Sequence, residues 1–228
     1  NAVSGVCIAG PDADPNGLLP PATLVALNNT DIGTLSPYLS VDGGTFEISP
    51  ELPNSLSMDP NTGVITGIPI ETMANTTFTV WSNHSDGTSL TYDFTIEVLE
   101  DSDGDGLPDE LPDDYDSSNP TSPGLVEDLD DDADGIPDTN ETDTGSYVNE
   151  SDTGTSPTNP DSDADGMCDG PNAVSNVCTA GPDAFPLDPA GDTDTDGDGK
   201  PDVLKPGVDS TSVPPLEEDL DDDGDGWE

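Results

Sequence analysis

The stretch that most constrains this chain is the twelve residues from Asp130 to Glu141, DDDADGIPDTNE. It places oxygen ligands at loop positions 1, 3, 5, 9 and 12 and glycine at position 6, the spacing that wraps a loop around one Ca²⁺. Side chains at positions 1, 3 and 5 converge only if the backbone then turns sharply, and glycine permits that turn. The predicted ligands are Asp130, Asp132, Asp134, the carbonyl of Ile136, Asp138 and a bidentate Glu141.

The same frame recurs in loops that begin at Asp101, Asp161, Asp194 and Asp221, so the five loops are spaced by 27 to 33 residues. A near-regular period in this range indicates a repeat array in which each unit leans on its neighbours. Position 12 holds no acid in the first, third and fourth loops, so linker carboxylates or water must complete the ligation there. The predicted ligands in these four loops are Asp101, Asp103, Asp105, Leu107, Asp109 and Asp113; Asp161, Asp163, Asp165, Met167 and Asp169, with Asp183 and Asp188 from the linker; Asp194, Asp196, Asp198, Lys200 and Asp202; and Asp221, Asp223 and Asp225.

The net charge of −49 is concentrated in the second half of the chain. Residues 101–228 hold 39 of the 51 acidic residues, and Lys200 and Lys205 are the only basic ones. This charge repels nucleic-acid phosphates and anionic membrane surfaces, so neither is an expected partner. An acidic, Pro- and Gly-rich stretch is usually a disordered tail, but a random tail would not repeat glycine at position 6 of five Asp frames. We expect residues 101–228 to be ordered by Ca²⁺ and expanded without it.

Residues 18–100 carry a different pattern. Apolar and polar residues alternate over Leu90–Val98 and again over Thr77–Ser82, as in strands with one buried face. The segment Asn83–Gly87 supplies turn residues that would join the two runs into a hairpin. Further short strands are predicted at Thr23–Leu27, Thr45–Ile48, Ser55–Met58 and Val64–Thr66. About seven short strands without a helical period predict a β-sandwich.

The segment Leu52–Pro69, LPNSLSMDPNTGVITGIP, resembles the signature of the Putative-Ig, cadherin-like domains of prokaryotic surface proteins. The resemblance covers roughly residues 22–99 and implies a β-sandwich spacer or adhesive domain without catalytic residues. Asn54 and Ser55 depart mildly from the family pattern. In physical terms, Pro60, Asn61 and Gly63 predict a tight turn between two strands.

The acidic loops resemble thrombospondin type 3 repeats, and the segments Ser156–Gly166 and Asp183–Asp188 are similar to the linkers between such repeats in microbial surface proteins. The resemblance covers most of residues 101–228 and implies an elongated array with almost no regular secondary structure. Proline at position 8 of three loops, with no amphipathic stripe after any loop, disfavours an EF-hand or dockerin. The predicted fold class is therefore mainly β plus irregular structure: an Ig/cadherin-like sandwich followed by a largely coil calcium-binding array.

Residues 1–17 nearly copy residues 172–184, with 11 of 13 positions identical, and we interpret them as the remnant of a preceding repeat module. In the downstream copy, Cys168 and Cys178 flank a turn-rich loop that a disulfide can close. Cys7 corresponds to Cys178 and has no counterpart of Cys168 before it. Its partner is then missing or intermolecular, or Cys7 is a buried free thiol.

Five sequons, at Asn28, Asn75, Asn83, Asn140 and Asn149, favour an extracellular glycoprotein. The sequence has no run of ~20 apolar residues, so no segment is predicted to span a bilayer. With no arginine and one histidine, and with the Asp pairs explained as Ca²⁺ ligands, no enzyme is predicted; a hydrolytic carboxylate pair is the weaker alternative. The leading hypothesis is a structural module of a surface stalk or filament. Its rival is a calcium-dependent adhesin whose sandwich binds a glycan or protein receptor.

The two ends also carry an expectation. Asn1 starts in the middle of a repeated motif, and Glu228 stops before position 9 of the fifth loop. Either the polypeptide continues or an adjoining copy supplies the missing groups. Both alternatives predict head-to-tail continuity, in which neighbouring protein completes the fifth loop and pairs with Cys7.

Overall fold

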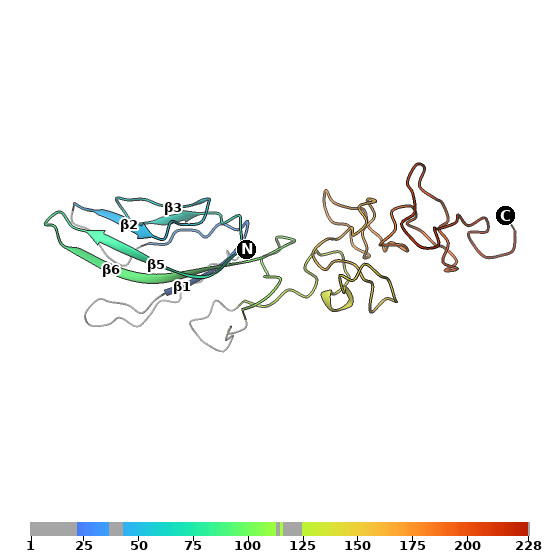
Figure 1. The fold of residues 1–228 in the computed structure, drawn as a ribbon, viewed down its shortest axis with the longest axis horizontal. Coiled ribbons are helices and arrows are strands. Elements are labelled where there is room, and N and C mark those ends of the chain that lie inside the picture. Colours follow the sequence, from blue (N-terminus) through green and yellow to red (C-terminus); the bar gives the residue numbers. More distant parts are fainter. Residues whose placement is uncertain (1–21, 37–42, 113–114, 116–124, 228) are drawn as a thin grey trace. The chain divides into compact units, whose positions relative to one another are not determined.

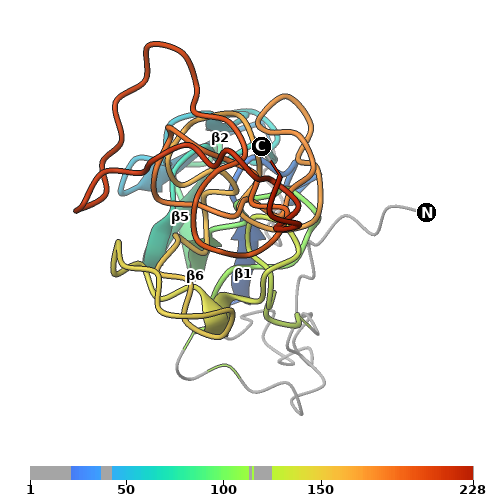
Figure 2. The ribbon, with the colours of Figure 1, turned by 90° about the vertical axis from the view of Figure 1, so that its right-hand side faces the viewer.

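The computed structural model describes residues 22–36, 43–112, 115 and 125–227. The chain divides into two compact units, Asn1–Asp128 and Leu129–Glu228. The first unit carries six strands among its described residues, and the second is coil and turns with one short 3₁₀ helix, η1, at Asp138–Asn140 (Figure 1; Figure 2). The fold class is therefore mainly β plus irregular structure, as predicted. In the part of the chain that is described, no helix is long and apolar enough to cross a bilayer.

The strands of the first unit form two sheets. The larger sheet has the spatial order β1 (Ala22–Leu27), β6 (Ser89–Leu99), β5 (Met73–Asn83) and β2 (Thr45–Ser49). β1 runs parallel to β6, and the other neighbours are antiparallel. The smaller sheet pairs β3 (Leu56–Met58) with β4 (Ile65–Gly67). Leu56 and Ile65 belong to the same buried cluster as the larger sheet, so the two sheets pack on one another.

β5 and β6 form the hairpin that the period-2 pattern predicts. Phe78 pairs with Phe94 in the register, and Val80 pairs with Tyr92. The turn is closed by the N–H of His84, which donates to the carbonyl of Thr88 over 2.8 Å. The hairpin thus supplies Phe78, Val80, Phe94, Ile96 and Val98 to the buried cluster.

The core comes from the alternating inward positions of these strands. Phe78 and Phe94 lie with their ring centroids 5.7 Å apart. Burial of such side chains is the main stabilising force for a unit of this size. The buried cluster is Leu24, Ala26, Ile32, Phe46, Leu56, Ile65, Phe78, Val80, Phe94, Ile96 and Val98.

The tight turn predicted at Pro60, Asn61 and Gly63 is present between β3 and β4. Asp59 accepts a hydrogen bond from the N–H of Asn61 over 2.7 Å, and Gly63 has a φ of +69°. Gly67 ends β4 at a φ of +135°, where a Cβ atom would lie 2.0 Å from the carbonyl oxygen of Ser55. Only glycine allows this close approach of the two strands.

Some sequence-based expectations fall outside the described residues. These are the remnant module at 1–17 with Cys7, and the ligand Asp113. The proposed domain boundaries at residues 17/18 and 100/101 stay predictions. The acidic loop that begins at Asp101 lies in the same compact unit as the sandwich.

Replacing Phe78 by alanine should destabilise the sandwich by about 3–5 kcal/mol, because it removes a fully buried ring and leaves a cavity. Leu90→Ala is the matched control. Leu90 is 49% exposed, so its replacement should lower the free energy of unfolding only slightly. Urea unfolding followed by Trp81 fluorescence, in a Trp227→Phe background, measures both. Equal midpoints for the two variants would contradict this account of the core.

Candidate metal centre

The five acidic loops share one set of local hydrogen bonds. In each loop the position-5 N–H donates to the position-3 carboxylate and the position-7 N–H donates to the position-5 carboxylate, over 2.7 to 3.2 Å. The position-6 glycine has a φ between +88° and +99° in all five. In the first four loops, the carboxylates at positions 1, 3 and 5 each bring an oxygen within 4.8 Å of the others. The predicted convergence of these side chains is therefore present.

Position 9 closes the loop. In the first four loops its carboxylate accepts a hydrogen bond from the position-2 N–H over 2.8 to 3.1 Å. In the first and fourth loops a hydroxyl at position 2 binds the second oxygen, so both oxygens of Asp109 and of Asp202 have protein donors. This geometry fits a contact to an ion through water, which is common at this position. Direct ligation by these residues stays a prediction, as does the role of the carbonyls of Leu107, Ile136, Met167 and Lys200.

The second loop is the most enclosed of the five. Asp132, Asp134 and Glu141 are 3%, 0% and 4% exposed. Asp134 and Glu141 come within 4.8 Å of Asp169, which belongs to the third loop. We call Asp130, Asp132, Asp134, Glu141 and Asp169 the second-loop cage. In the part of the chain that is described, Oδ2 of Asp132 and Oε2 of Glu141 are buried and accept no hydrogen bond.

A threonine network positions Glu141. Thr155 is fully buried, and its hydroxyl donates to Oε1 of Glu141 over 2.9 Å. The hydroxyl of Thr153 lies 2.6 Å from that of Thr155, and it also contacts the carbonyl of Asn140 at 3.0 Å. Because Oε1 already has a protein donor, Oε2 is the oxygen that remains for an ion. The sequence pattern gave no sign of this network, since Thr155 lies 14 residues from its partner.

The disulfide between Cys168 and Cys178 is present, as predicted. It lies beside Asp169 and Gly170, which cross to the second loop. The N–H of Gly170 donates to Oδ2 of Asp134 over 2.6 Å. A Cβ atom at Gly170 would lie 2.4 Å from Oδ1 of Asp134, so a larger residue would push the two loops apart. Asp169, predicted as a ligand of its own loop, accepts the N–H of Ser162 in that loop and also lies beside Asp134 and Glu141 of the preceding one.

The third loop has a cage of the same kind. Asp161 is 7% exposed, and Asp183 from the linker is 7% exposed. The N–H of Asp183 donates to the carbonyl of Cys168 over 3.1 Å, so this linker residue lies beside the third loop. Its contact with a metal stays a prediction. Oδ2 of Asp163 and Oδ2 of Asp183 are buried and accept no hydrogen bond from described residues. We call Asp161, Asp163, Asp165 and Asp183 the third-loop cage.

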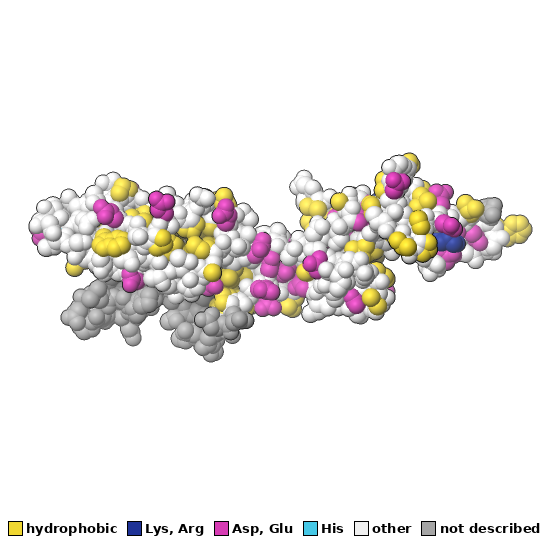
Figure 3. Space-filling model, in the orientation of Figure 1, with side chains coloured by type: hydrophobic (Ala, Val, Ile, Leu, Met, Phe, Trp, Pro, Cys, Tyr) yellow, Lys and Arg dark blue, Asp and Glu magenta, His cyan; other side chains and the backbone are white. Residues whose placement is uncertain are grey.

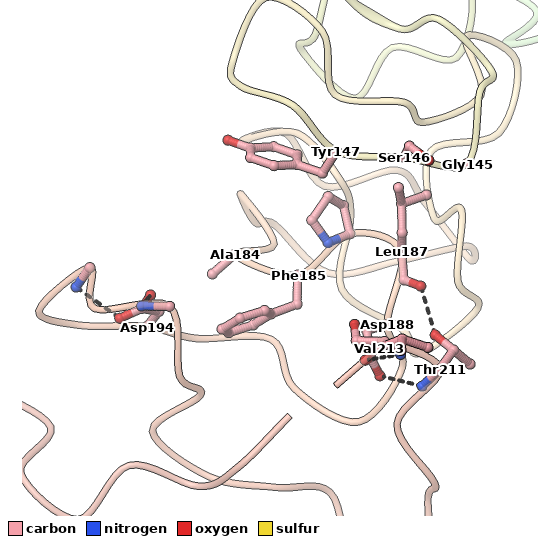
Figure 4. Close-up of a pocket in the computed structure, with 14 residues that line it drawn as sticks. Gly145, Ser146, Tyr147, Ala184, Phe185, Leu187, Asp188, Asp194, Thr211 and Val213 are labelled. Atoms are coloured by element: carbon pink, nitrogen blue, oxygen red, sulfur yellow. Dashed lines mark hydrogen bonds between the residues drawn. The ribbon is translucent and has the colours of Figure 1, made fainter. Parts of the chain in front are cut away.

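Asp188, the other linker residue expected to complete a loop, has a different role. Its carboxylate accepts hydrogen bonds from the Ser210 hydroxyl and from the N–H groups of Ala190, Thr211 and Ser212. These bonds hold the segment 210–212 beside an open groove of about 1140 Å³ (Figure 4). Tyr147 and Phe185 extend toward this groove. Asp188 therefore organises the chain locally, and its predicted metal contact is untested.

The first loop is tied to the sandwich. Asp101 is 3% exposed, and its N–H donates to the side-chain oxygen of Asn28 over 3.1 Å. The N–H of Asn28 in turn donates to the carbonyl of Leu99 at the end of β6. Oδ2 of Asp101 is buried without a hydrogen-bond partner among the described residues. The fourth and fifth loops are more exposed than the others.

The enclosure of these carboxylates disfavours their charged forms. Burial, together with the neighbouring charge of Asp132, raises the pKa of Glu141 to about 9. Burial and the charge of Asp134 raise the pKa of Asp132 to about 8. In the third loop, burial raises the pKa of Asp183 to about 8 and that of Asp163 to about 7. Such groups hold a proton or a cation near neutral pH.

Comparison with known proteins finds a family match within the first unit. Residues 19–99 match the family described as Putative Ig domain. This confirms the resemblance seen at Leu52–Pro69 and covers about a third of the chain. The first Ig-like domain of human CD48 antigen is similar to 47% of this chain over its full length, with 10% identity and a TM-score of 0.32. No curated protein matches the chain. The resemblance of the acidic loops to thrombospondin type 3 repeats stays a hypothesis.

The raised pKa values predict an unusual pH dependence for the cation-free protein. A carboxyl whose folded pKa lies above its unfolded value stabilises the fold below the unfolded pKa, and this contribution is lost as the pH rises through the folded pKa. In EDTA, the second loop should therefore be most ordered near pH 4 and lose order between about pH 6 and pH 9. Carboxyl ¹³C chemical shifts of Glu141 and Asp132 measure this directly. Titration of both groups near pH 4 would contradict the cage.

The predicted glycosylation sites differ in exposure. Asn75 and Asn149 are exposed, and Asn83 and Asn140 are half-buried. Asn28 is 9% exposed, and its side-chain oxygen accepts the hydrogen bond from Asp101. A glycan on Asn28 would have to open this contact. We therefore expect modification at Asn75 and Asn149 and an unmodified Asn28, to be measured by glycopeptide mapping of the chain from its native source. A fully occupied Asn28 would contradict the described junction.

Proposed function

We propose that this chain is a structural module of an extracellular stalk or filament whose acidic loops are ordered by Ca²⁺. The observation that carries the proposal is the second-loop cage. Asp132, Asp134 and Glu141 are almost completely buried among like charges, with two oxygens that lack a hydrogen bond within the described chain. A buried charge that is not paired is strongly unfavourable, so these groups need protons or a cation.

The donor set favours a hard cation. Every side chain in the second-loop cage offers carboxylate oxygen, and oxygen is the donor that Ca²⁺, Mg²⁺ and Mn²⁺ prefer. Mg²⁺ usually keeps several waters and uses only one or two carboxylates, whereas Ca²⁺ accepts 6–8 oxygens in flexible geometry. A site with five converging carboxylates therefore suits Ca²⁺ best. When bound, Ca²⁺ would supply the positive charge that this cluster lacks.

Hydrophobic burial is too small to order the second unit. Among its described residues, the buried hydrophobic side chains other than proline are Cys168, Cys178 and Ala190. A segment with so little apolar surface cannot offset its ordering entropy without cross-links or ligands. The disulfide is one such cross-link, and cation binding would provide the others.

Contacts between successive loops support a spacer role. Gly170 of the third loop contacts Asp134 of the second, and Gly224 of the fifth loop lies against Asp196 of the fourth. An array in which each loop packs on its neighbour can transmit order along one direction. We propose that adjoining copies or further chain extend this array, and we assign it no catalytic role.

The Ig-like domain and the disulfide are typical of extracellular surface proteins. They support the proposed location and also leave a second candidate, a calcium-dependent adhesin. Ile68, Ile70 and Leu90 are exposed on the Ig-like unit by 44–54%, and Figure 3 shows hydrophobic side chains on the face of this unit. Exposed apolar groups of this kind are common at binding surfaces. Binding of a glycan or protein receptor by the full chain would favour the adhesin.

Small-angle scattering and calorimetry test the calcium proposal. Adding Ca²⁺ to the EDTA-treated chain should reduce the radius of gyration, far more than an equal ionic strength of NaCl, because ligation replaces carboxylate repulsion. Asp134→Asn should weaken the tightest site by about tenfold or more, since ligand-shell changes have at least this effect. Asp143→Asn is the matched control, because Asp143 is exposed and lies outside the five loops.

An unchanged radius of gyration with Ca²⁺ would overturn the proposal. Equal losses of affinity in the two variants would show that net charge, rather than the second-loop cage, governs binding.

A further inference from the structure

The chain has only two basic residues, and both lie against acidic loops. Lys200 pairs with Asp198 of its own loop at 2.6 Å. Lys205 pairs with Asp165, the position-5 residue of the third loop, across 40 residues of sequence. On the face drawn in Figure 3, basic side-chain atoms (dark blue) are visible at one place in the second unit, beside acidic side chains (magenta). The placement of Lys205 is unexpected, since its sequence position corresponds to position 12 of the fourth loop.

The backbone and the side chain both fix Lys205. Its N–H donates to the carbonyl of Ala190 over 2.8 Å, and Ala190 is 1% exposed. Its ammonium contacts Oδ2 of Asp165 and lies 3.3 Å from Oδ2 of Asp192. The Lys205 side chain is 25% exposed, whereas that of Asp165 is 1% exposed. The ion pair with Asp165 is therefore largely shielded from water.

This ammonium occupies an oxygen that an ion in the third loop would use. Oδ1 of Asp165 already accepts the N–H of Met167 over 2.8 Å, so Oδ2 is the oxygen left for a ligand. Asp183 is 7% exposed, and its Oδ2 is buried and accepts no hydrogen bond among the described residues. The third-loop cage thus holds an unsatisfied buried carboxylate beside a resident positive charge.

The second-loop cage has no such lysine, because both basic side chains of the chain pair elsewhere in the described structure. A dication that enters the third loop must either displace the ammonium from Asp165 or lie next to it. Displacement costs the ion pair with Asp165, and a position next to the ammonium costs affinity through the repulsion of like charges at short range.

We infer that Lys205 is an affinity-determining residue of the third loop: its ammonium competes for Asp165 and makes this loop a weaker divalent-cation site than the second. The inference rests on the proposed calcium function. It gives the array a built-in order of filling, in which the second loop binds at lower calcium concentrations and the third loop binds later. The third loop would then respond to calcium at concentrations at which the second loop is already filled.

Hydrogen exchange with mass spectrometry resolves the loops separately, through peptic peptides that cover 130–141 and 161–170. In the full chain, a CaCl₂ titration should protect the second-loop peptide at a lower midpoint than the third-loop peptide. Lys205→Met keeps the aliphatic stem and removes the charge, and it should lower the third-loop midpoint on the order of tenfold, the effect of one nearby charge on an ionisable site. The second-loop midpoint should stay unchanged.

Two variants control this experiment. Lys205→Arg keeps the positive charge and should keep the wild-type order of filling. Thr158→Asp adds one negative charge at an exposed position, the same change in net charge as Lys205→Met, and should shift the third-loop midpoint much less. Protection of both peptides at saturating CaCl₂ shows that each variant is folded.

The outcomes separate the inference from the function on which it rests. An unchanged or higher third-loop midpoint in Lys205→Met would overturn the inference and make Lys205 a purely structural ion pair. Equal shifts in Lys205→Met and Thr158→Asp would also overturn it, because net charge would then be the cause. If calcium protects neither loop in the wild-type chain, the proposed function itself fails.

Discussion

Repulsion among carboxylates that the fold places side by side is the constraint on which the second unit depends. Asp132, Asp134 and Glu141 are almost completely buried, together with Asp169 from the next loop. Their neighbours are like charges rather than apolar side chains, so this part of the chain inverts the usual rule for protein interiors. Its order is therefore conditional on whatever neutralises these groups.

The two units are stabilised by different forces. Among its described residues, the Ig-like unit has eleven hydrophobic residues in one buried cluster, to which both sheets contribute. The second unit has local hydrogen bonds, one disulfide and converging acids. A hydrophobic core is largely insensitive to the ionic composition of the medium, whereas a carboxylate cluster responds to both pH and cations. The chain thus joins a unit with a hydrophobic core to a unit whose order depends on neutralisation of its carboxylates.

Contacts between loops organise the second unit. Asp169 and Gly170 connect the third loop to the second, and Lys205, at the end of the fourth loop, connects that loop to the third. Each link places a group from one loop at a carboxylate of another. Occupation of one cage by a cation would therefore alter the electrostatic environment of the next one.

Much of the architecture was determined by the sequence alone. The β5–β6 hairpin, the turn at Asp59–Gly63 and the Cys168–Cys178 bridge were predicted because each depends on residues close together in the chain. The convergence of positions 1, 3 and 5 followed for the same reason, since glycine at position 6 and bonds between adjacent positions build each loop locally. Tertiary structure decided the rest. The contacts of Asn28 with Asp101, Thr155 with Glu141, Asp188 with Ser210 and Lys205 with Asp165 cross 14 to 73 residues. Coil has no periodicity that relates such distant positions, so only the folded chain shows which carboxylates are buried together and which one meets a lysine.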